Sequence, residues 1–84
     1  MNSLKKLVTK FVNEPQKITE NECEQLLNCL GYVEKKKAGS ERVFHKSGSI
    51  AINVPRPKKD KYVKSPYIRR IIRLLELERY LEGE

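Results

Sequence analysis

The sequence predicts a single two-layer α+β domain. Its elements follow the order α-α-β-β-β-α, with the helices on one face of a three-stranded antiparallel sheet. Three observations support this class. Apolar residues recur at helical spacing up to residue 30, alternate with polar residues through residue 54, and return to helical spacing after residue 65. A chain of 84 residues has room for one small domain with a modest core.

Two helices are expected before the sheet, near residues 3–13 and 19–30. The apolar stripe of the first helix consists of Leu4, Leu7, Val8, Phe11 and Val12. The second helix has a start signal, because Thr19 can cap it and Glu22 can return the bond to the cap N–H. Its apolar stripe consists of Cys23, Leu26, Leu27 and Leu30. Gly31 stands where a left-handed C-cap residue belongs.

The sheet is expected to consist of three short strands at residues 32–37, 41–46 and 50–54, joined by turns at 38–40 and 47–49. The apolar face of the last strand consists of Ile50, Ile52 and Val54.

The register of the second strand stays open at this point. If Phe44 faces the helices, then Arg42 faces them too. If Val43 faces them instead, Glu41 and His45 share that side. Either choice brings a polar side chain toward the core.

A stiff basic loop at residues 55–61 follows, since two prolines exclude a central strand there. Ser65 and Pro66 then indicate the cap and first position of a helix near residues 66–81. Its buried stripe consists of Ile68, Ile71, Ile72 and Leu75. A second apolar strip consists of Leu74, Leu77 and Leu81. This strip either packs on the helix at 3–13 or forms a seam with a second copy or a partner protein.

The positive charge of the chain is concentrated in its middle. The net charge is +7, yet residues 31–73 alone carry +10, with 13 of the 18 basic residues and three of the 11 acids. Such a region attracts a polyanion and releases its counterions on contact. Nucleic acid is therefore the first expectation for a partner.

Other classes are less well supported by the sequence. No apolar run is long enough to span a membrane, and no apolar signal segment follows the start, so a cytoplasmic protein is expected. Cys23 and Cys29 fall on different helix faces and are expected to be two small buried thiols, with neither a metal pair nor a disulfide. No metal or organic cofactor is expected.

The expected phosphate contacts are the cations of the strands and of the loop before the last helix: Lys35, Lys37, Arg42, Arg56, Lys58, Lys59, Lys61 and Lys64. Helix N-termini also attract phosphate, which favours the loop group. The lysines at 35–37 have an alternative explanation as protection of a strand edge. Arg69, Arg70 and Arg73 extend the positive patch along the last helix or simply form a solvated surface. Tyr62 and Tyr67 either stack on bases or pack against the loop.

The order and spacing of several short motifs resemble the HicA toxins, a family of small bacterial RNA-cleaving proteins. The expected helix at 19–30 ends in Gly31-Tyr32, a basic stretch leads to Gly39-Ser40, and the third strand ends in Asn53-Val54-Pro55 before a basic loop and a helix that opens at Ser65. The match covers roughly residues 19–75 within a core at 19–82, and the helix at 3–13 is an addition.

The resemblance implies a fold like that of double-stranded-RNA-binding domains, cleavage of mRNA without a cofactor, and neutralisation by a HicB-like antitoxin with an acidic surface. The usual Gly-Ser-His motif reads Gly39-Ser40-Glu41 here, so Glu41 stands at the position of the catalytic histidine. Arg56 stands where a second histidine is frequent.

The candidate catalytic residues are therefore Glu41 as base, Arg42 as phosphate ligand and His45 as acid, with Ser40 among the RNA contacts. Glu41 and His45 share a strand face about 13 Å apart, which makes His45 peripheral. A solvated turn residue and a surface histidine are the simpler explanation of the pair. A non-catalytic RNA-binding or protein-interaction module is the alternative function.

Overall fold

The computed structural model describes residues 3–35, 41–57 and 59–82. Its elements run, in order, α1 (Ser3–Asn13), the 3-10 turn η1 (Pro15–Lys17), α2 (Glu20–Cys29), β1 (Val33–Lys35), β2 (Glu41–His45), β3 (Ile52–Pro55), α3 (Ser65–Leu75) and α4 (Glu78–Glu82). The predicted α+β class and the order α-α-β-β-β-α are confirmed. None of the described helices is long and apolar enough to cross a membrane.

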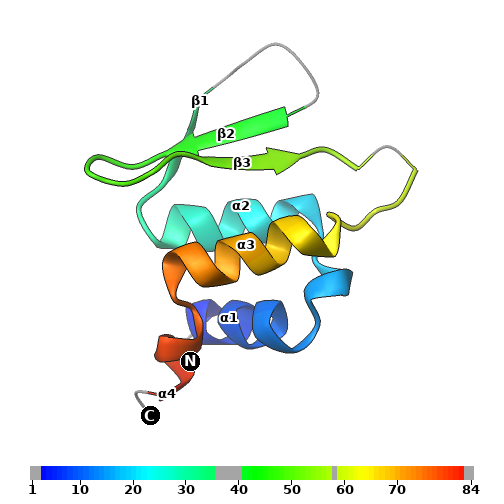
Figure 1. Cartoon of the computed structure of the whole chain (residues 1–84), viewed down its shortest axis with the longest axis horizontal. Helices are drawn as coiled ribbons and strands as arrows, with labels where there is room; N and C mark the ends of the chain where they lie inside the picture. The colour runs from blue at the N-terminus through cyan, green and yellow to red at the C-terminus, as the bar shows by residue number, and fades with distance from the viewer. Residues whose placement is uncertain (1–2, 36–40, 58, 83–84) are drawn as a thin grey trace.

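The sheet is antiparallel with strand order β1-β2-β3, and all helices lie on one side of it. Figure 1 shows α2 and α3 directly beneath the sheet and α1 beneath that pair. Helix α4 contacts α1. The two predicted layers are therefore present, and α1 with α4 adds a further level on the side away from the sheet.

Phe44 decides the strand register that the sequence left open. Its side chain is fully buried, so the inner face of β2 carries Phe44 and Arg42. Their partners on β3 are Ile52 and Val54, which are also buried. The outer face of β2 consists of Glu41, Val43 and His45.

The signals at the ends of α2 act as predicted. The Glu22 N–H donates to the Thr19 hydroxyl oxygen at 3.2 Å, and the Thr19 N–H donates to Glu22 Oε1 at 2.9 Å. This is the reciprocal capping box. At the other end Gly31 has φ +94°, a left-handed backbone conformation that glycine adopts without steric cost.

The single helix predicted at 66–81 is wrong, because the chain breaks at Glu76 into α3 and α4. Glu76 adopts a left-handed conformation with φ 50°. The break turns Leu77 into the core, where it is fully buried and its N–H bonds to the Ile72 carbonyl at 3.0 Å. Leu81 is partly buried against the same core, so these two leucines pack inside, whereas Leu74 stays 40% exposed.

Several predicted boundaries also shift. Strand β3 begins at Ile52 rather than Ile50, which is 69% exposed, because strand pairing ends at the Phe44–Ile52 pair. Strand β1 begins at Val33, since the N–H of Tyr32 still closes α2 by bonding to a helix carbonyl.

Two local predictions about caps and cysteines are corrected as well. The cap position of α3 is Lys64 rather than Ser65, with Pro66 in the first turn. Cys23 is buried, but Cys29 is exposed and not a buried thiol, because six residues of helix place the two about 120° apart around the helix axis. Both cysteines are free.

Candidate nucleic-acid interface

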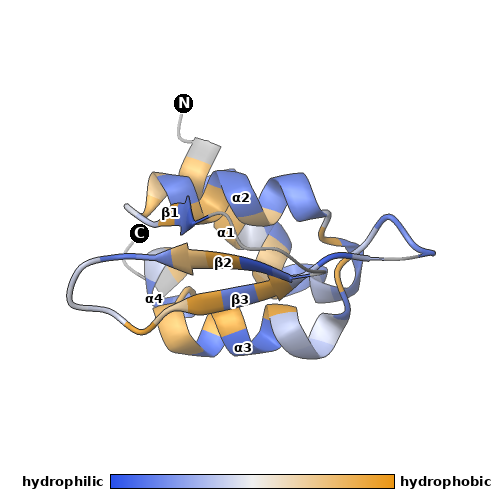
Figure 2. Ribbon diagram, turned by 90° about the horizontal axis from the view of Figure 1, so that it is seen from above, coloured by the Kyte–Doolittle hydropathy of each residue, from blue (hydrophilic) through white to orange (hydrophobic). Residues whose placement is uncertain are grey.

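One surface depression follows the free edge of β3, between that strand, the loop after it, and α3. Figure 2, which looks onto the sheet, shows α3 running alongside β3. The larger hollow, of about 510 Å³, is lined by Glu41, Pro55, Arg56, Pro57, Lys59, Asp60, Tyr62, Lys64 and Tyr67. The smaller, of about 230 Å³, is lined by Glu41, Ala51, Ile52, Asn53, Tyr67, Arg70, Ile71 and Leu74. Together they form what we call the β3–α3 groove.

The groove is held in place by the end of the basic loop. The Val63 N–H donates to the Ile18 carbonyl at 2.8 Å, and Tyr62 forms an isolated antiparallel bridge with Thr19. Val63 is 2% exposed and belongs to the core. The loop is therefore fastened to the start of α2 immediately before α3 begins, which fixes the position of Lys64 and of the first turn of α3.

Cations outnumber carboxylates in the β3–α3 groove. Its described lining carries four cations, Arg56, Lys59, Lys64 and Arg70, against the two carboxylates of Glu41 and Asp60. All four cations are exposed. Lys64 is also the cap residue of α3, an 11-residue helix whose N-terminal end favours anions. The groove thus combines exposed cationic side chains with the dipole of α3.

Glu41 lies where the two hollows of the groove meet. It is the first residue of β2, on the outer face of the sheet opposite Pro55. The Asn53 side-chain amide donates a hydrogen bond to Glu41 Oε1 at 3.2 Å, which orients the carboxylate while leaving it exposed to solvent. Alternation along β3 puts Asn53 between the buried Ile52 and Val54, so an outward polar residue was foreseeable, but its bond to Glu41 was not.

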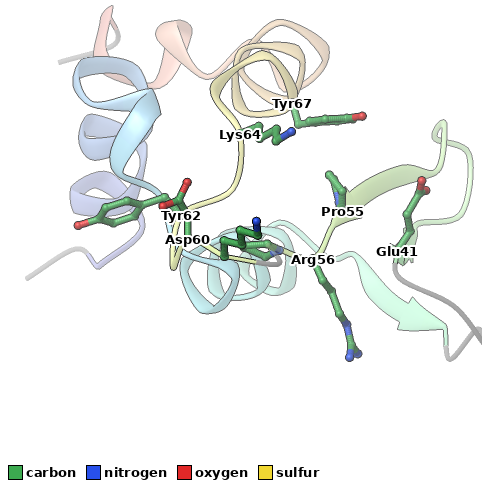
Figure 3. A pocket seen from close by; sticks show the side chains of 9 residues that line it. Glu41, Pro55, Arg56, Asp60, Tyr62, Lys64 and Tyr67 are labelled. Atoms are coloured by element: carbon green, nitrogen blue, oxygen red, sulfur yellow. The ribbon is translucent and has the colours of Figure 1, made fainter.

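Tyr67 is the aromatic side chain best placed for contact with a ligand. Its side chain is 40% exposed. Among the described residues, Tyr67 and Glu41 are the two that line both hollows. In Figure 3 its ring extends from the start of α3 toward the side where Glu41 and Pro55 lie, whereas Tyr62 and Arg56 point away. Tyr62 is half-buried, and the Lys61 ammonium lies 5.2 Å from the centre of its ring.

Arg42 lies outside the groove, which corrects its prediction as a phosphate ligand and catalytic group. Its side chain is 10% exposed and faces α2 from the inner side of the sheet. The guanidinium donates to the carboxylates of Glu34, Glu24 and Glu20. The hydrogen bond to Glu34, opposed by burial, raises the pKa of Arg42 above its ordinary value. Arg42 therefore connects β2 to β1 and α2.

Arg56 also contacts Glu20, one of the three glutamates around Arg42. Its Nε lies 3.4 Å from Glu20 Oε2, and the side chain is 57% exposed. This ion pair is long and exposed to solvent, so it orients Arg56 only weakly, and the guanidinium can still bind an anion.

Two further predicted site residues, His45 and Lys35, lie away from the groove. His45 is exposed at the opposite end of β2 from Glu41, where it pairs with Val33 of β1. Lys35 is exposed on β1, at the far edge of the sheet. Lys37, Ser40 and Lys58 lie outside the described residues.

The arginines of α3 divide between two sides of the helix. Arg70 lines the groove, while Arg69 and Arg73 line a separate hollow with Val12, Ile72 and residues of the α3–α4 junction. Among residues 3–35, 41–57 and 59–82, no three His, Cys, Asp or Glu side chains cluster closely enough to hold a metal ion.

Comparisons of the chain with protein-family models, with curated proteins and with solved structures found no match.

Proposed function

We propose that the β3–α3 groove binds single-stranded RNA and that the protein is a HicA-like toxin which cleaves mRNA. One observation carries this proposal: Glu41, at the position of the family's catalytic histidine, lies in a groove with four exposed cations and the N-terminal end of α3. Cations grouped around a helix N-terminus favour phosphate. Tyr67 offers a surface on which a base can stack.

Cleavage is assigned to Glu41. Its carboxylate accepts the proton of an RNA 2′-hydroxyl, O2′ bonds to phosphorus, and the bond to O5′ breaks, while O5′ takes a proton from solvent in the open groove. Lys64 and Arg70 offset the negative charge that builds on the phosphate. His45 has no part in this chemistry, because it lies at the other end of β2.

The proposal extends to a partner and a compartment. A HicB-like antitoxin with an acidic surface would neutralise the protein by covering the cations of the groove, in the cytoplasm where mRNA is translated. The leucine strip predicted as a possible seam with a second copy or a partner is largely used within this chain, because Leu77 and Leu81 pack on its own core. Leu74 remains exposed.

A second candidate function is a non-catalytic RNA-binding module of the same fold. It is favoured by the positions of Arg42 and His45, which leave Glu41 as the one predicted catalytic residue at the groove. The two functions share the binding surface and differ in turnover.

A growth experiment separates them. Expression of the wild-type chain is expected to arrest bacterial growth with loss of mRNA, and Glu41→Gln is expected to relieve both while keeping RNA affinity. Glu78→Gln, a matched change of an exposed glutamate on α4, is the control and should remain toxic. If Glu41→Gln is as toxic as the wild type, Glu41 is not the base. If neither chain degrades RNA but both bind it, the binding module is correct.

A further inference from the structure

The smaller hollow of the β3–α3 groove has a lining that differs from the phosphate-binding part. Its apolar lining residues are Ala51, Ile52, Ile71 and Leu74, but Ile52 and Ile71 are nearly fully buried, so polar atoms form the larger share of its wall. Two planar groups border it, the Tyr67 phenol and the Arg70 guanidinium, and its polar edge is formed by Asn53 and Glu41. Planar side chains beside several hydrogen-bonding groups suit one flat heterocycle, because its faces stack and its edge is polar.

The size of this hollow limits what it can hold. Its volume of about 230 Å³ falls below the ~300–1,000 Å³ of cavities that hold drug-sized ligands. One planar ring system fits this scale. Aromatic and guanidinium planes stack on the π-faces of any base, which makes Tyr67 and Arg70 suitable walls.

The two hollows also lie in the right order for one nucleotide and the phosphate beside it. The larger hollow is lined by Lys59, Lys64 and Arg56, of which Arg56 points away from Glu41, whereas the smaller one contains Arg70 and the four apolar side chains. Glu41 and Tyr67 line both. A strand with its phosphate in the larger hollow and its base in the smaller one therefore places its ribose at Glu41.

We propose that the smaller hollow is a nucleobase subsite, in which one base of a single-stranded RNA stacks on Tyr67 and thereby brings the ribose 2′-hydroxyl of that nucleotide to Glu41. This inference rests on the proposed RNA-binding function and adds the register of the strand. The Asn53 amide donates one N–H to Glu41 Oε1, and its carbonyl oxygen and second N–H are the groups with which the edge of a base can pair.

The test compares two ligands that carry the same phosphates. One is a heptamer of adenylate RNA, and the other is a heptamer of the same ribose-phosphate chain without bases. We expect the wild-type chain to bind the base-containing heptamer about tenfold more tightly, the scale of one base–aromatic stack. Tyr67→Ala should abolish this difference, and Tyr67→Phe should keep it because the ring is retained.

Two further variants make the test specific. Tyr80→Ala removes a tyrosine of similar exposure, 43% against 40%, from α4, and it should leave the tenfold difference intact. Leu74→Trp fills the hollow from its exposed rim, and it should abolish the difference while the baseless chain still binds.

The outcomes separate the subsite from the function on which it rests. Equal affinity of the wild type for both heptamers, or a difference that survives Tyr67→Ala, would overturn the subsite while leaving phosphate binding in place. If neither heptamer binds, the proposed RNA-binding function fails and the subsite fails with it.

Discussion

Arg42 and Glu34 form a two-point ion pair across neighbouring strands. Arg42 Nε donates to Glu34 Oε2 at 2.7 Å, and Arg42 Nη2 donates to the other carboxylate oxygen. The same guanidinium reaches Glu24 at 2.9 Å and Glu20 at 3.4 Å, and it lies 5.4 Å from the ring centre of Phe44. A cation that the sequence predicts at the RNA surface is instead part of the connection between the sheet and α2.

Replacement of Arg42 should therefore cost stability and not RNA affinity. Arg42→Met keeps the volume of the side chain but leaves three glutamates without their shared cation. We expect a loss of about 2 kcal/mol in the free energy of unfolding, measured by urea denaturation. Arg79→Ala breaks the exposed Arg79–Glu76 pair and should cost no more than about 0.5 kcal/mol. A large loss of RNA affinity in the folded Arg42→Met chain would contradict this assignment.

The capping box at Glu22 should give a pH-dependent stability. Burial alone would raise the pKa of Glu22, but hydrogen bonds from Lys10 and Thr19 outweigh it and lower that pKa below its ordinary 4.5. A lowered folded-state pKa stabilises the fold above pH 4.5, and this contribution is lost as the pH falls through the folded value.

Glutamine can still accept the Thr19 N–H bond of the capping box, so Glu22→Gln removes only the charge interactions with Lys10 and with the N-terminal end of α2, and we expect a cost of about 1 kcal/mol or less at neutral pH. The difference from the wild type should persist down to pH 4.5 and shrink below it, in urea unfolding followed across a pH series. Glu78→Gln, at an exposed position of α4, provides the matched control. A difference that stays constant into acid would show that the carboxylate charge is not the stabilising feature.

The two cysteines should react at very different rates. Cys29 is exposed, whereas burial raises the pKa of the Cys23 thiol to about 12. Because the thiolate is the reactive form, a thiol reagent should modify one cysteine quickly in the native protein and the second on unfolding. Cys29→Ser should remove the fast phase and Cys23→Ser should keep it. Fast modification of both thiols in the native wild type would refute the buried position of Cys23.

The break between α3 and α4 should contribute to stability because it buries Leu77. The Leu77 side chain is fully buried in the core, so Leu77→Ala should lower the free energy of unfolding by about 3 kcal/mol. Leu74→Ala removes the same atoms from a side chain that is 40% exposed, and it should cost about 1 kcal/mol or less. Equal costs at the two positions would mean that the helix continues through Glu76 in solution.

Much of the fold could be predicted because local signals and apolar spacing agree. The capping box at Thr19 and the left-handed Gly31 define α2, and the period-two stretch defines the sheet. The break at Glu76 carries no such signal, since glutamate is an unusual left-handed residue and the helical apolar spacing runs straight through it. Burial of Leu77 against the rest of the core decides that break, and this is a tertiary effect.

The site was harder to predict, because charge in the sequence does not say which way a side chain faces. The direction of Arg42 depends on the strand register, which burial of Phe44 sets. The loop cations Arg56, Lys59 and Lys64 were predicted together, and the structure places them in one hollow. Their meeting with Arg70 and Asn53 requires α3 to run beside β3, a relation between elements that no short motif encodes.

The most direct test of the β3–α3 groove as an RNA-binding surface is the affinity for a single-stranded RNA as a function of salt, for the wild type, Arg70→Ala and Arg69→Ala. These neighbouring arginines are both exposed on α3, but Arg70 lines the groove and Arg69 faces the other hollow. We predict that log Kd of the wild type depends linearly on log salt. Arg70→Ala should reduce that slope by about 0.7, the value for one phosphate contact on a single strand, and Arg69→Ala should leave it unchanged. A flat salt profile, or equal effects of the two substitutions, would contradict the assignment of the groove as the RNA-binding surface.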